Sequence, residues 1–309
     1  MPSLAHGGVG GVATGRVAPA AVPPGWTAAN RTSVLESHHE GRIPDAVIHL
    51  EVKQHVDKPS SVDVNDFERV NVAGTRQWLD WASRNGVTTF VLASSIKAVQ
   101  ADGDEINEAA APEHLDPYGA SKARAEDAVR AWCDESPERR GVILRFVPIY
   151  GPGNEANLAA FARQVCQGKP CLIGQGQSRK SIVSRANAVA AIEHVLKLQA
   201  RGILVFNVAD PVARSLMDLA GMIAAATSSP RPRSIPVVAA FMAAKAGDWL
   251  TGCLGCDFPL TTRRFKTLTT DLVVSSAKLA ATGFVPPQTT ADGIAEMARW
   301  LAEQHAAGP

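Results

Sequence analysis

Tyr118 and Lys122, four residues apart, are the side chains of this sequence best placed to do acid–base chemistry. On a helix, residues i and i+4 lie on one face, one turn apart, so the ammonium group would lie beside the phenol. A nearby positive charge favours the phenolate and lowers the tyrosine pKa. A tyrosine tuned in this way can donate or accept a proton near neutral pH. The alternative is an exposed Tyr–Lys pair on a helix surface, because the spacing alone is only suggestive.

The residues around this pair favour a catalytic position. Asp116-Pro117 directly precedes the tyrosine, and proline fits the first turn of a helix, so a helix is expected to run from here to about residue 133. Upstream, residues 89–95 form a short apolar run that ends in Ser94 and Ser95, as is typical of a buried parallel strand. A strand that ends in hydroxyl groups, followed by a Tyr-x-x-x-Lys helix, is a known constellation of catalytic groups.

Five motifs, in order along the chain, resemble the extended short-chain dehydrogenase/reductases, and specifically the NAD-dependent epimerase/dehydratase group that acts on nucleotide sugars. Together they are specific, although none would be alone. Ser94-Ser95-Ile96-Lys97 is most similar to bacterial UDP-sugar 4-epimerases and 4-keto-sugar reductases of surface-polysaccharide synthesis. The resemblance covers about residues 43–305. The motifs are Asp45-Ala46-Val47-Ile48-His49-Leu50, Val70-Asn71-Val72-Ala73-Gly74-Thr75, Ser94-Ser95-Ile96-Lys97, Pro117-Tyr118-Gly119-Ala120-Ser121-Lys122 and Leu144-Arg145-Phe146-Val147-Pro148-Ile149-Tyr150-Gly151-Pro152-Gly153.

The resemblance implies an α/β fold, a doubly wound parallel sheet of the Rossmann type with a smaller C-terminal substrate lobe. The alternation of apolar strands with helices supports this fold. We expect residues 1–150 and 182–210 to form the dinucleotide-binding domain, with residues 1–30 irregular. Residues 151–181 and 211–309 would form the substrate-binding lobe.

The resemblance also implies three catalytic residues, Ser95, Tyr118 and Lys122. Tyr118 would take or give the proton of a sugar hydroxyl, and Ser95 would hydrogen-bond the same sugar oxygen. Lys122 would lower the tyrosine pKa and hold the nicotinamide ribose. Leu50, Val147, Tyr118 and Lys122 are the expected cofactor-binding residues. The cofactor would be NAD, with NADP not excluded, and it would supply the hydride chemistry.

Asn157, Arg179 and Lys180 are the candidates for binding the nucleotide diphosphate, together with Ser95 at the sugar. They fall near the places where the family has an amide and a basic residue, and the alternative is a solvated loop. The favoured function is a UDP-sugar 4-epimerase or 4-keto reductase. Two other functions stay open: a binding or regulatory protein of the same fold with impaired cofactor binding, and a dehydrogenase of a different alcohol or carbonyl, such as a steroid-like substrate.

The N-terminal segment departs from the family pattern. Residues 1–30 are rich in Gly, Ala, Val and Pro and carry no clear helix or strand. A glycine-rich turn after the first strand should hold the pyrophosphate, and the best candidate has Gly15 with Ala18 and Ala21 in the other two glycine places. Glu51 is a second departure, because a carboxylate beside a pyrophosphate is unfavourable. We therefore expect weak dinucleotide binding.

Composition narrows the other possibilities. A net charge of +1 gives no electrostatic case for nucleic acid. Residues 235–256 come closest to a membrane span, but Lys245 and Asp248 interrupt them, so a buried amphipathic helix is expected instead. Five cysteines without a paired framework fit a reducing cytoplasm. The Cys253-Leu254-Gly255-Cys256 motif lacks the further ligands of a zinc site, so no metal is expected.

The remaining pattern predicts a helix over residues 66–85 and a linker over residues 230–236. A homodimer is expected, because the family pairs two helices per subunit, here about residues 66–83 and 118–133. Trp78, Trp81 and Trp132 offer large apolar surface on these helices, with burial against the protein's own sheet as the alternative.

Overall fold

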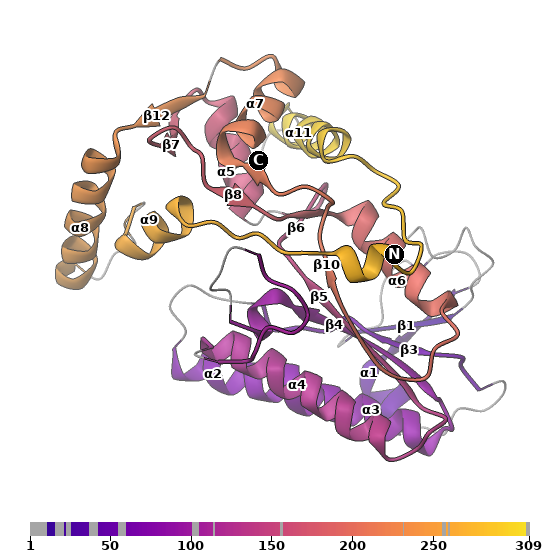
Figure 1. Ribbon diagram of the computed structural model, residues 1–309. Coiled ribbons are helices and arrows are strands. Elements are labelled where there is room, and N and C mark those ends of the chain that lie inside the picture. The colour runs from indigo at the N-terminus through magenta and orange to yellow at the C-terminus, as the bar shows by residue number, and fades with distance from the viewer. Residues whose placement is uncertain are drawn as a thin grey trace.

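The chain forms two groups of elements, one around a parallel sheet and the other a set of helices placed over one end of that sheet (Figure 1). This computed structural model describes residues 11–15, 22, 26–36, 43–54, 60–100, 105–113, 115–154, 157–230, 232–254, 258 and 260–306.

A four-stranded parallel sheet is the centre of the first group. Its strand order is β10-β5-β4-β3, and every neighbouring pair is parallel. β4 and β5 are almost wholly buried, as expected of apolar strands covered on both faces. The strands are β3 (Val47–His49), β4 (Thr89–Ser95), β5 (Arg140–Phe146) and β10 (Gly202–Val208).

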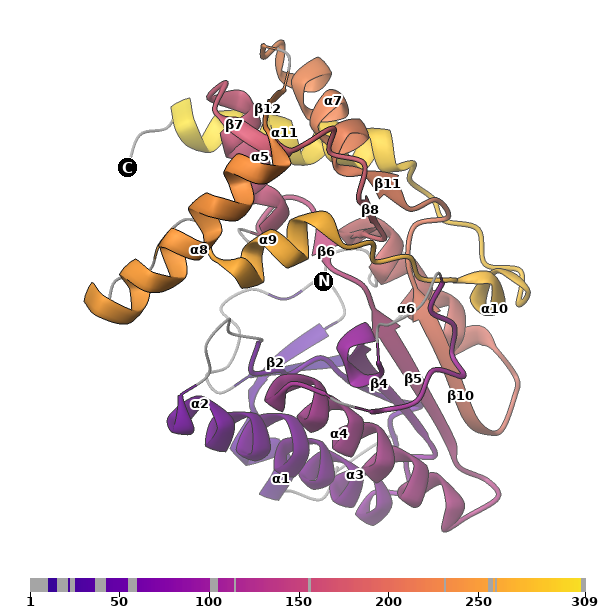
Figure 2. The ribbon, with the colours of Figure 1, turned by 60° about the vertical axis from the view of Figure 1, so that its left-hand side comes forward.

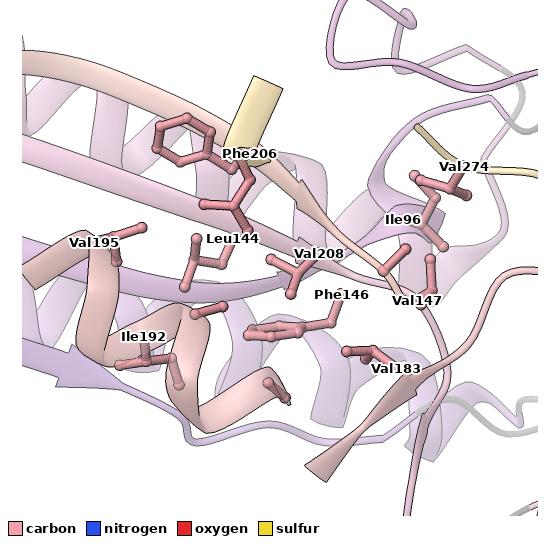
Figure 3. Packing of buried hydrophobic residues seen from close by; sticks show 14 of the residues in the cluster. Ile96, Leu144, Phe146, Val147, Val183, Ile192, Val195, Phe206, Val208 and Val274 are labelled. Atoms are coloured by element: carbon pink, nitrogen blue, oxygen red, sulfur yellow. The ribbon is translucent and has the colours of Figure 1, made fainter. Parts of the chain in front are cut away.

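Helices cover both faces of the sheet, which is therefore doubly wound, as predicted. α3 (Gly74–Arg84) and α4 (Pro117–Asp134) pack on one face. α6 (Arg185–Lys197) packs on the other, where its apolar side chains meet those of β5 and β10 (Figure 3). The alternative that the sequence left open for Trp78, Trp81 and Trp132 is the one observed: all three are buried in the core between sheet, α3 and α4. They offer no dimer surface, and the homodimer stays a prediction.

The helix predicted over residues 66–85 begins earlier and is not regular. α2 (Ser61–Asp66) starts at a capping box made by Ser60 and Asp63. It continues through a π-helical stretch, η2 (Phe67–Ala73), into α3. Such stretches are rare and occur frequently at functional sites.

α4 begins where the sequence predicts. Asp116 caps it by accepting a hydrogen bond from the Gly119 N–H at 2.7 Å, and Pro117 lies in the first turn. Gly119 lies against η3 (Ile96–Ala98), the short turn that follows β4. A Cβ at position 119 would lie 2.2 Å from the Lys97 carbonyl oxygen, so a residue without one is required here. This contact fixes the start of α4 against the end of β4.

The second group of elements, here called the helical lobe, is built on α5, α7 and α11, which share an apolar core of their own. Short strand pairs and the α8–α9 hairpin adjoin this core (Figures 1 and 2). The elements that follow β5 outside the sheet and α6 are β6 (Ile149–Tyr150), α5 (Asn157–Cys166), β7 (Pro170–Ile173), β8 (Arg179–Lys180), β9 (Val183–Ser184), β11 (Arg214–Ser215), α7 (Leu216–Thr227), β12 (Arg233–Ile235), α8 (Val237–Leu254), α9 (Thr262–Thr269), α10 (Ala277–Ala280) and α11 (Thr290–Ala306).

A buried carboxylate, Asp210, connects the sheet to the helical lobe. It follows β10 and is 3% exposed. Its oxygens accept hydrogen bonds from Tyr150 Oη at 3.1 Å, Asn187 Nδ2 at 2.8 Å, Ser184 N at 3.3 Å and Thr290 Oγ1 at 3.1 Å. A buried charge needs such donors to offset its lost hydration. Asp210 therefore holds β6, α6 and α11 together where the chain passes between the two groups.

The expectation of an irregular N-terminus is wrong, because residues 11–30 contain two strands. β1 (Gly11–Gly15) and β2 (Trp26–Asn30) pair in parallel, and α1 (Arg31–Glu36) follows and contacts them and α3. Glycine and alanine fill three of the five positions of β1, and alanine and asparagine fill three of the five positions of β2. These residue types are depleted in strands, so the sequence pattern did not reveal them. Only ten residues separate β1 from β2, fewer than the dozen or more of a helical crossover. Residues 16–21, with Ala18 and Ala21, lie outside the described residues.

Two C-terminal predictions also need correction. Residues 230–236 are not a linker, because β12 within them pairs in parallel with β7. The helix expected over residues 235–256 is α8, but most of its described side chains are exposed. The buried residues of α8 are Ala240, Ala244 and Gly247. Their stripe is narrow and their side chains are small, so most of the apolar surface of α8 remains exposed.

Candidate functional site

The carboxyl ends of β3, β4 and β5 lie next to one another, because the three strands are parallel and in register. Leu50, Ser95 and Val147 occupy these ends: Leu50 follows β3, Ser95 ends β4 and pairs with Phe146, and Val147 follows β5. Leu50 is half-buried, whereas Val147 is buried in the core (Figure 3). In open α/β sheets, ligands bind at this edge.

Tyr118 lies in the first turn of α4, next to Ser95. The Ser95 hydroxyl lies close enough to the phenol to affect its pKa, and Phe67 of η2 packs edge-on against the phenol with 5.8 Å between ring centroids. Burial raises the pKa of Tyr118, the Ser95 hydroxyl lowers it and the charge of Asp116 raises it, with a net upward direction. The predicted lowering of this pKa is therefore wrong. The phenol keeps its proton near neutral pH, as a general acid must.

Lys122 follows one turn further along α4 and is 2% exposed. Its Nζ donates a hydrogen bond of 2.6 Å to the carbonyl oxygen of Ala93, two residues before Ser95 on β4. Burial lowers the Lys122 pKa to about 8, and the nearby charge of Glu126 opposes that effect. Within the described part of the chain, Ala93 supplies the ammonium's one hydrogen-bond acceptor. Two of its three N–H donors are therefore available to a ligand.

The two serines that end β4 have different surroundings. Ser94 Oγ donates to Glu126 Oε1 at 2.7 Å, and Arg145 Nη2 donates to the other carboxylate oxygen at 2.8 Å. This Glu126–Arg145 pair is buried between β5 and α4 and was not predicted. A lone arginine inside an apolar strand was the signal, because such a charge requires a buried partner. Ser94 thus belongs to the packing of α4 on the sheet, whereas Ser95 lies at the candidate site.

Asn71 is a second buried residue to which the sequence assigned no role. It lies in η2 and is 1% exposed. Its Nδ2 donates to Ser121 Oγ at 2.9 Å, and its Oδ1 accepts from the Lys53 N–H at 2.8 Å. Ser121 Oγ in turn donates to the Tyr118 carbonyl oxygen at 2.7 Å. Asn71 therefore links the segment after β3 to the turn that carries Tyr118, and an amide in an apolar helical pattern was its signal.

The charges after β3 are compensated. Glu51 Oε2 forms an ion pair with Arg31 Nε at 3.2 Å, so the carboxylate predicted to repel a pyrophosphate has a cationic partner from α1. His49 is buried, and burial, followed by the charges of Lys122 and Arg31, lowers its pKa to about 3. His49 is thus a neutral imidazole at pH 7. His55 lies outside the described residues.

The structure places the predicted diphosphate ligands in the helical lobe, on elements separate from the strand ends. Asn157 is exposed at the start of α5. Arg179 forms an ion pair with Asp271, with 2.9 Å between Nη2 and Oδ2. Lys180 Nζ donates to the carbonyl oxygens of Thr267 and Thr270 at the end of α9. Arg179 and Lys180 therefore fasten β8 to the segment after α9, a role that the sequence did not reveal.

Within the described ranges, no cluster of three or more His, Cys, Asp or Glu side chains could hold a metal ion. None of the helices in the described part of the chain is long and apolar enough to cross a membrane. Cys133 and Cys166 are free thiols. The Cys253 and Cys256 side chains lie outside the described residues.

The sequence model of the NAD dependent epimerase/dehydratase family matches residues 27–209, a stretch that contains Ser95, Tyr118 and Lys122 and begins after β1. The chain is 27% identical over 252 residues to the N-acetyl-alpha-D-glucosaminyl-diphospho-ditrans,octacis-undecaprenol 4-epimerase of Escherichia coli O157:H7, covering 81% of this chain and 75% of that protein. It is 30% identical over 265 residues to the UDP-glucose 4-epimerase of Vibrio cholerae, covering 82% and 75%.

A solved structure shows the same fold. The UDP-glucose 4-epimerase of Thermus thermophilus, in complex with NAD, superposes with a TM-score of 0.69 at 21% identity, covering 97% of this chain and 93% of that one. The family match extends over more than half of the chain and includes the Tyr-x-x-x-Lys helix. The chain therefore belongs to the NAD-dependent epimerase/dehydratase family of enzymes, as its motifs predicted.

Proposed function

We propose that this protein is an NAD(P)-dependent epimerase or oxidoreductase of sugar diphosphates, with a UDP-sugar 4-epimerase or 4-keto reductase as the first choice. The observation that carries this proposal is the position of Tyr118, beside Ser95 at the carboxyl edge of the sheet and one turn from the buried ammonium of Lys122. The names of the two relatives, both 4-epimerases, support it.

Tyr118 and Ser95 would handle the sugar oxygen. Both hydroxyl groups can hydrogen-bond the same oxygen atom, because they lie close together at the end of β4. When a keto sugar is reduced, Tyr118 donates its phenolic proton to that oxygen, and when an alcohol is oxidised it takes the proton back. The raised pKa suits the first of these steps. The second step needs positive charge near the phenol, which the Lys122 ammonium can provide.

Lys122, Leu50 and Val147 would hold the nicotinamide half of the cofactor. The fit rests on Lys122, a buried ammonium with two N–H donors left for ribose hydroxyls at the end of β4. The dinucleotide, when bound, would supply hydride transfer at the carbon that bears the reacting oxygen. Leu50 and Val147 would line the strand ends on either side of Ser95.

The group attached to the sugar through the diphosphate is the part of the substrate that the proposal leaves unassigned. One relative is named for a uridine diphosphate sugar and the other for a sugar diphosphate joined to undecaprenol, so the sugar diphosphate is the shared chemistry. Asn157, Arg179 and Lys180 are the proposed diphosphate ligands. Arg179 is paired with Asp271, so a bound diphosphate would compete with that carboxylate.

A turnover assay tests the proposal. Purified protein is incubated with UDP-glucose or UDP-N-acetylglucosamine and NAD⁺ or NADH, and the configuration at sugar C4 is followed by nuclear magnetic resonance. A 4-epimerase inverts C4 without net change in the dinucleotide, whereas a reductase consumes NADH when a 4-keto sugar is supplied as substrate. Turnover of a steroid-like alcohol in place of any sugar diphosphate would contradict the proposal.

A non-catalytic binding protein of the same fold is the second candidate. The ten-residue connection between β1 and β2 favours it, because a helix that presents its N-terminus to the pyrophosphate does not fit in a connection of that length. Such a protein would bind UDP in a calorimetric titration but turn over none of these substrates. Turnover with either dinucleotide would exclude it.

A further inference from the structure

α8 presents an apolar surface to solvent. Val238, Met242 and Trp249 are 75%, 63% and 68% exposed, and Val237 and Phe241 are about half exposed. Alanines at positions 239, 243 and 246 add to the same surface. A helix that is apolar all round is normally buried in a core or in a membrane. Clusters of large exposed apolar side chains mark a binding surface. α8 therefore requires a partner.

The exposure does not come from loose packing of the α8–α9 hairpin. A Cβ at Gly247 would lie 2.1 Å from the carbonyl oxygen of Leu260, so the backbone just before α9 packs directly against α8. Phe241 and Phe265 pack edge to face, with 5.6 Å between ring centroids. Asp248, on the side of α9, accepts a hydrogen bond from the Thr262 N–H at 3.2 Å. The hairpin is thus a packed unit whose outer face is fixed.

The charges around this face are predominantly positive. Residues 231–270 contain six lysines and arginines and two aspartates, a net charge of +4, whereas the whole chain has a net charge of +1. Lys245 lies over the Phe241 ring on α8, and Arg263 and Lys266 are exposed on α9. Cationic side chains beside exposed apolar ones complement an anionic lipid surface, which attracts both.

We propose that the outer face of α8, with the cations of α9, docks the protein on an anionic phospholipid bilayer. α8 would lie in the plane of the interface with Val238, Met242 and Trp249 inserted, because Lys245 and Asp248 in its middle disfavour a position across the bilayer. Trp249 has the amphipathic ring that is enriched at such interfaces. A second copy of this chain is a less favourable partner for α8, because a two-fold symmetric contact would bring the basic α9 segments of both copies together. The proposal does not depend on the reaction.

Sedimentation of the full chain with lipid vesicles tests this docking surface. Vesicles of phosphatidylcholine are compared with vesicles in which about one third is phosphatidylglycerol. The wild type is expected to bind the anionic vesicles at least ten-fold more strongly. The triple variant Val238→Gln, Met242→Gln and Trp249→Gln should lose at least ten-fold of that binding. A matched control, Val62→Gln with Val285→Gln, replaces side chains that are 68% and 80% exposed elsewhere and should bind as the wild type does.

A second variant makes the test independent of whether the triple variant folds. Arg263→Glu with Lys266→Glu leaves the apolar face intact and should remove the preference for anionic vesicles, with an unchanged thermal melting curve. Absence of wild-type binding to either vesicle would overturn the proposal. So would equal binding by the triple variant. The proposal would also be overturned if the wild type formed oligomers without lipid and the triple variant did not, because a second copy would then cover α8.

Discussion

Lys122 carries a charge that its surroundings disfavour. Its pKa of about 8, against an ordinary value of 10.5, means that burial of the ammonium costs about 3 kcal/mol at neutral pH. Between pH 8 and 10.5 the unfolded chain binds more protons at this residue than the folded protein, so stability rises with pH there. A cost of this kind is retained where the charge serves the site rather than the fold.

Replacing Lys122 by methionine should separate the two roles. Lys122→Met is expected to abolish turnover while leaving the protein no less stable at pH 7, because the buried charge is gone along with its hydrogen bond. Urea unfolding at pH 7, 8, 9 and 10 measures the difference between variant and wild type. That difference should move in favour of the wild type by about 2–3 kcal/mol across this range. Parallel pH profiles would contradict the shifted pKa.

The residues that could be found from sequence are those whose partners are close along the chain. Tyr118 and Lys122 share one helix face, and Ser95 ends the strand before it, so local spacing suggested this group and the family resemblance assigned its roles. Asn71 and Asp210 bind segments that are distant along the chain, and no local pattern predicts such contacts. The direction of the Tyr118 pKa also depends on burial, which a sequence does not show.

At the scale of elements, the start of α4 sets the position of the phenol. Gly119→Ala should lower turnover at least about ten-fold, since a Cβ at 2.2 Å from the Lys97 carbonyl must push the first turn away from η3. Gly221→Ala in α7 is the matched control, because its Cβ would meet no atom within 4 Å. It should leave turnover unchanged and raise stability by about 0.5–1 kcal/mol. Equal activity in both variants would show that the glycine contact does not position Tyr118.

The attachment of β8 to the segment after α9 gives a second test at this scale. If Arg179 binds a diphosphate, Arg179→Ala should weaken UDP binding by about 10–100-fold, the value of a charged hydrogen bond shielded from water. Asp271→Asn should instead tighten binding, because it removes the competing carboxylate and keeps the oxygen that accepts the Arg179 N–H. Isothermal titration with UDP measures both. Unchanged affinity in both variants would leave Arg179 as a purely structural residue.

Helices and strands with a strong periodic pattern of apolar residues were predictable from sequence, and elements without such a pattern were not. β3, β4, β5 and α4 follow their patterns because burial decides them. β1 and β2 are short, and most of their residues are glycine, alanine or asparagine, which are depleted in strands. α8 was misjudged because its apolar residues suggested a core position, whereas its buried described residues are the small Ala240, Ala244 and Gly247.

At the scale of the whole molecule, the doubly wound sheet and the helical lobe place the strand ends between them (Figure 1). The connection between β1 and β2 is ten residues long, shorter than a helical crossover. We predict a dissociation constant for NAD(H) above about 1 μM, because a connection of this length is shorter than a crossover helix whose N-terminal amides would hold a pyrophosphate. Nicotinamide fluorescence titration measures it. Sub-micromolar affinity would show that residues 16–25 form an effective phosphate-binding turn.

The chain has two tyrosines, and comparing them tests the central claim most directly. Tyr118→Phe should lower turnover of the sugar diphosphate by about 10²–10⁴-fold with an unchanged melting temperature, because it removes only the catalytic proton. Tyr150→Phe removes the hydroxyl group of the other tyrosine, which donates a hydrogen bond to Asp210. It should cost about 1 kcal/mol of stability with turnover retained. The kcat of the two variants on the same substrate is the measurement. Turnover by Tyr118→Phe within a few-fold of the wild type would contradict the assignment of Tyr118 as the proton donor and acceptor.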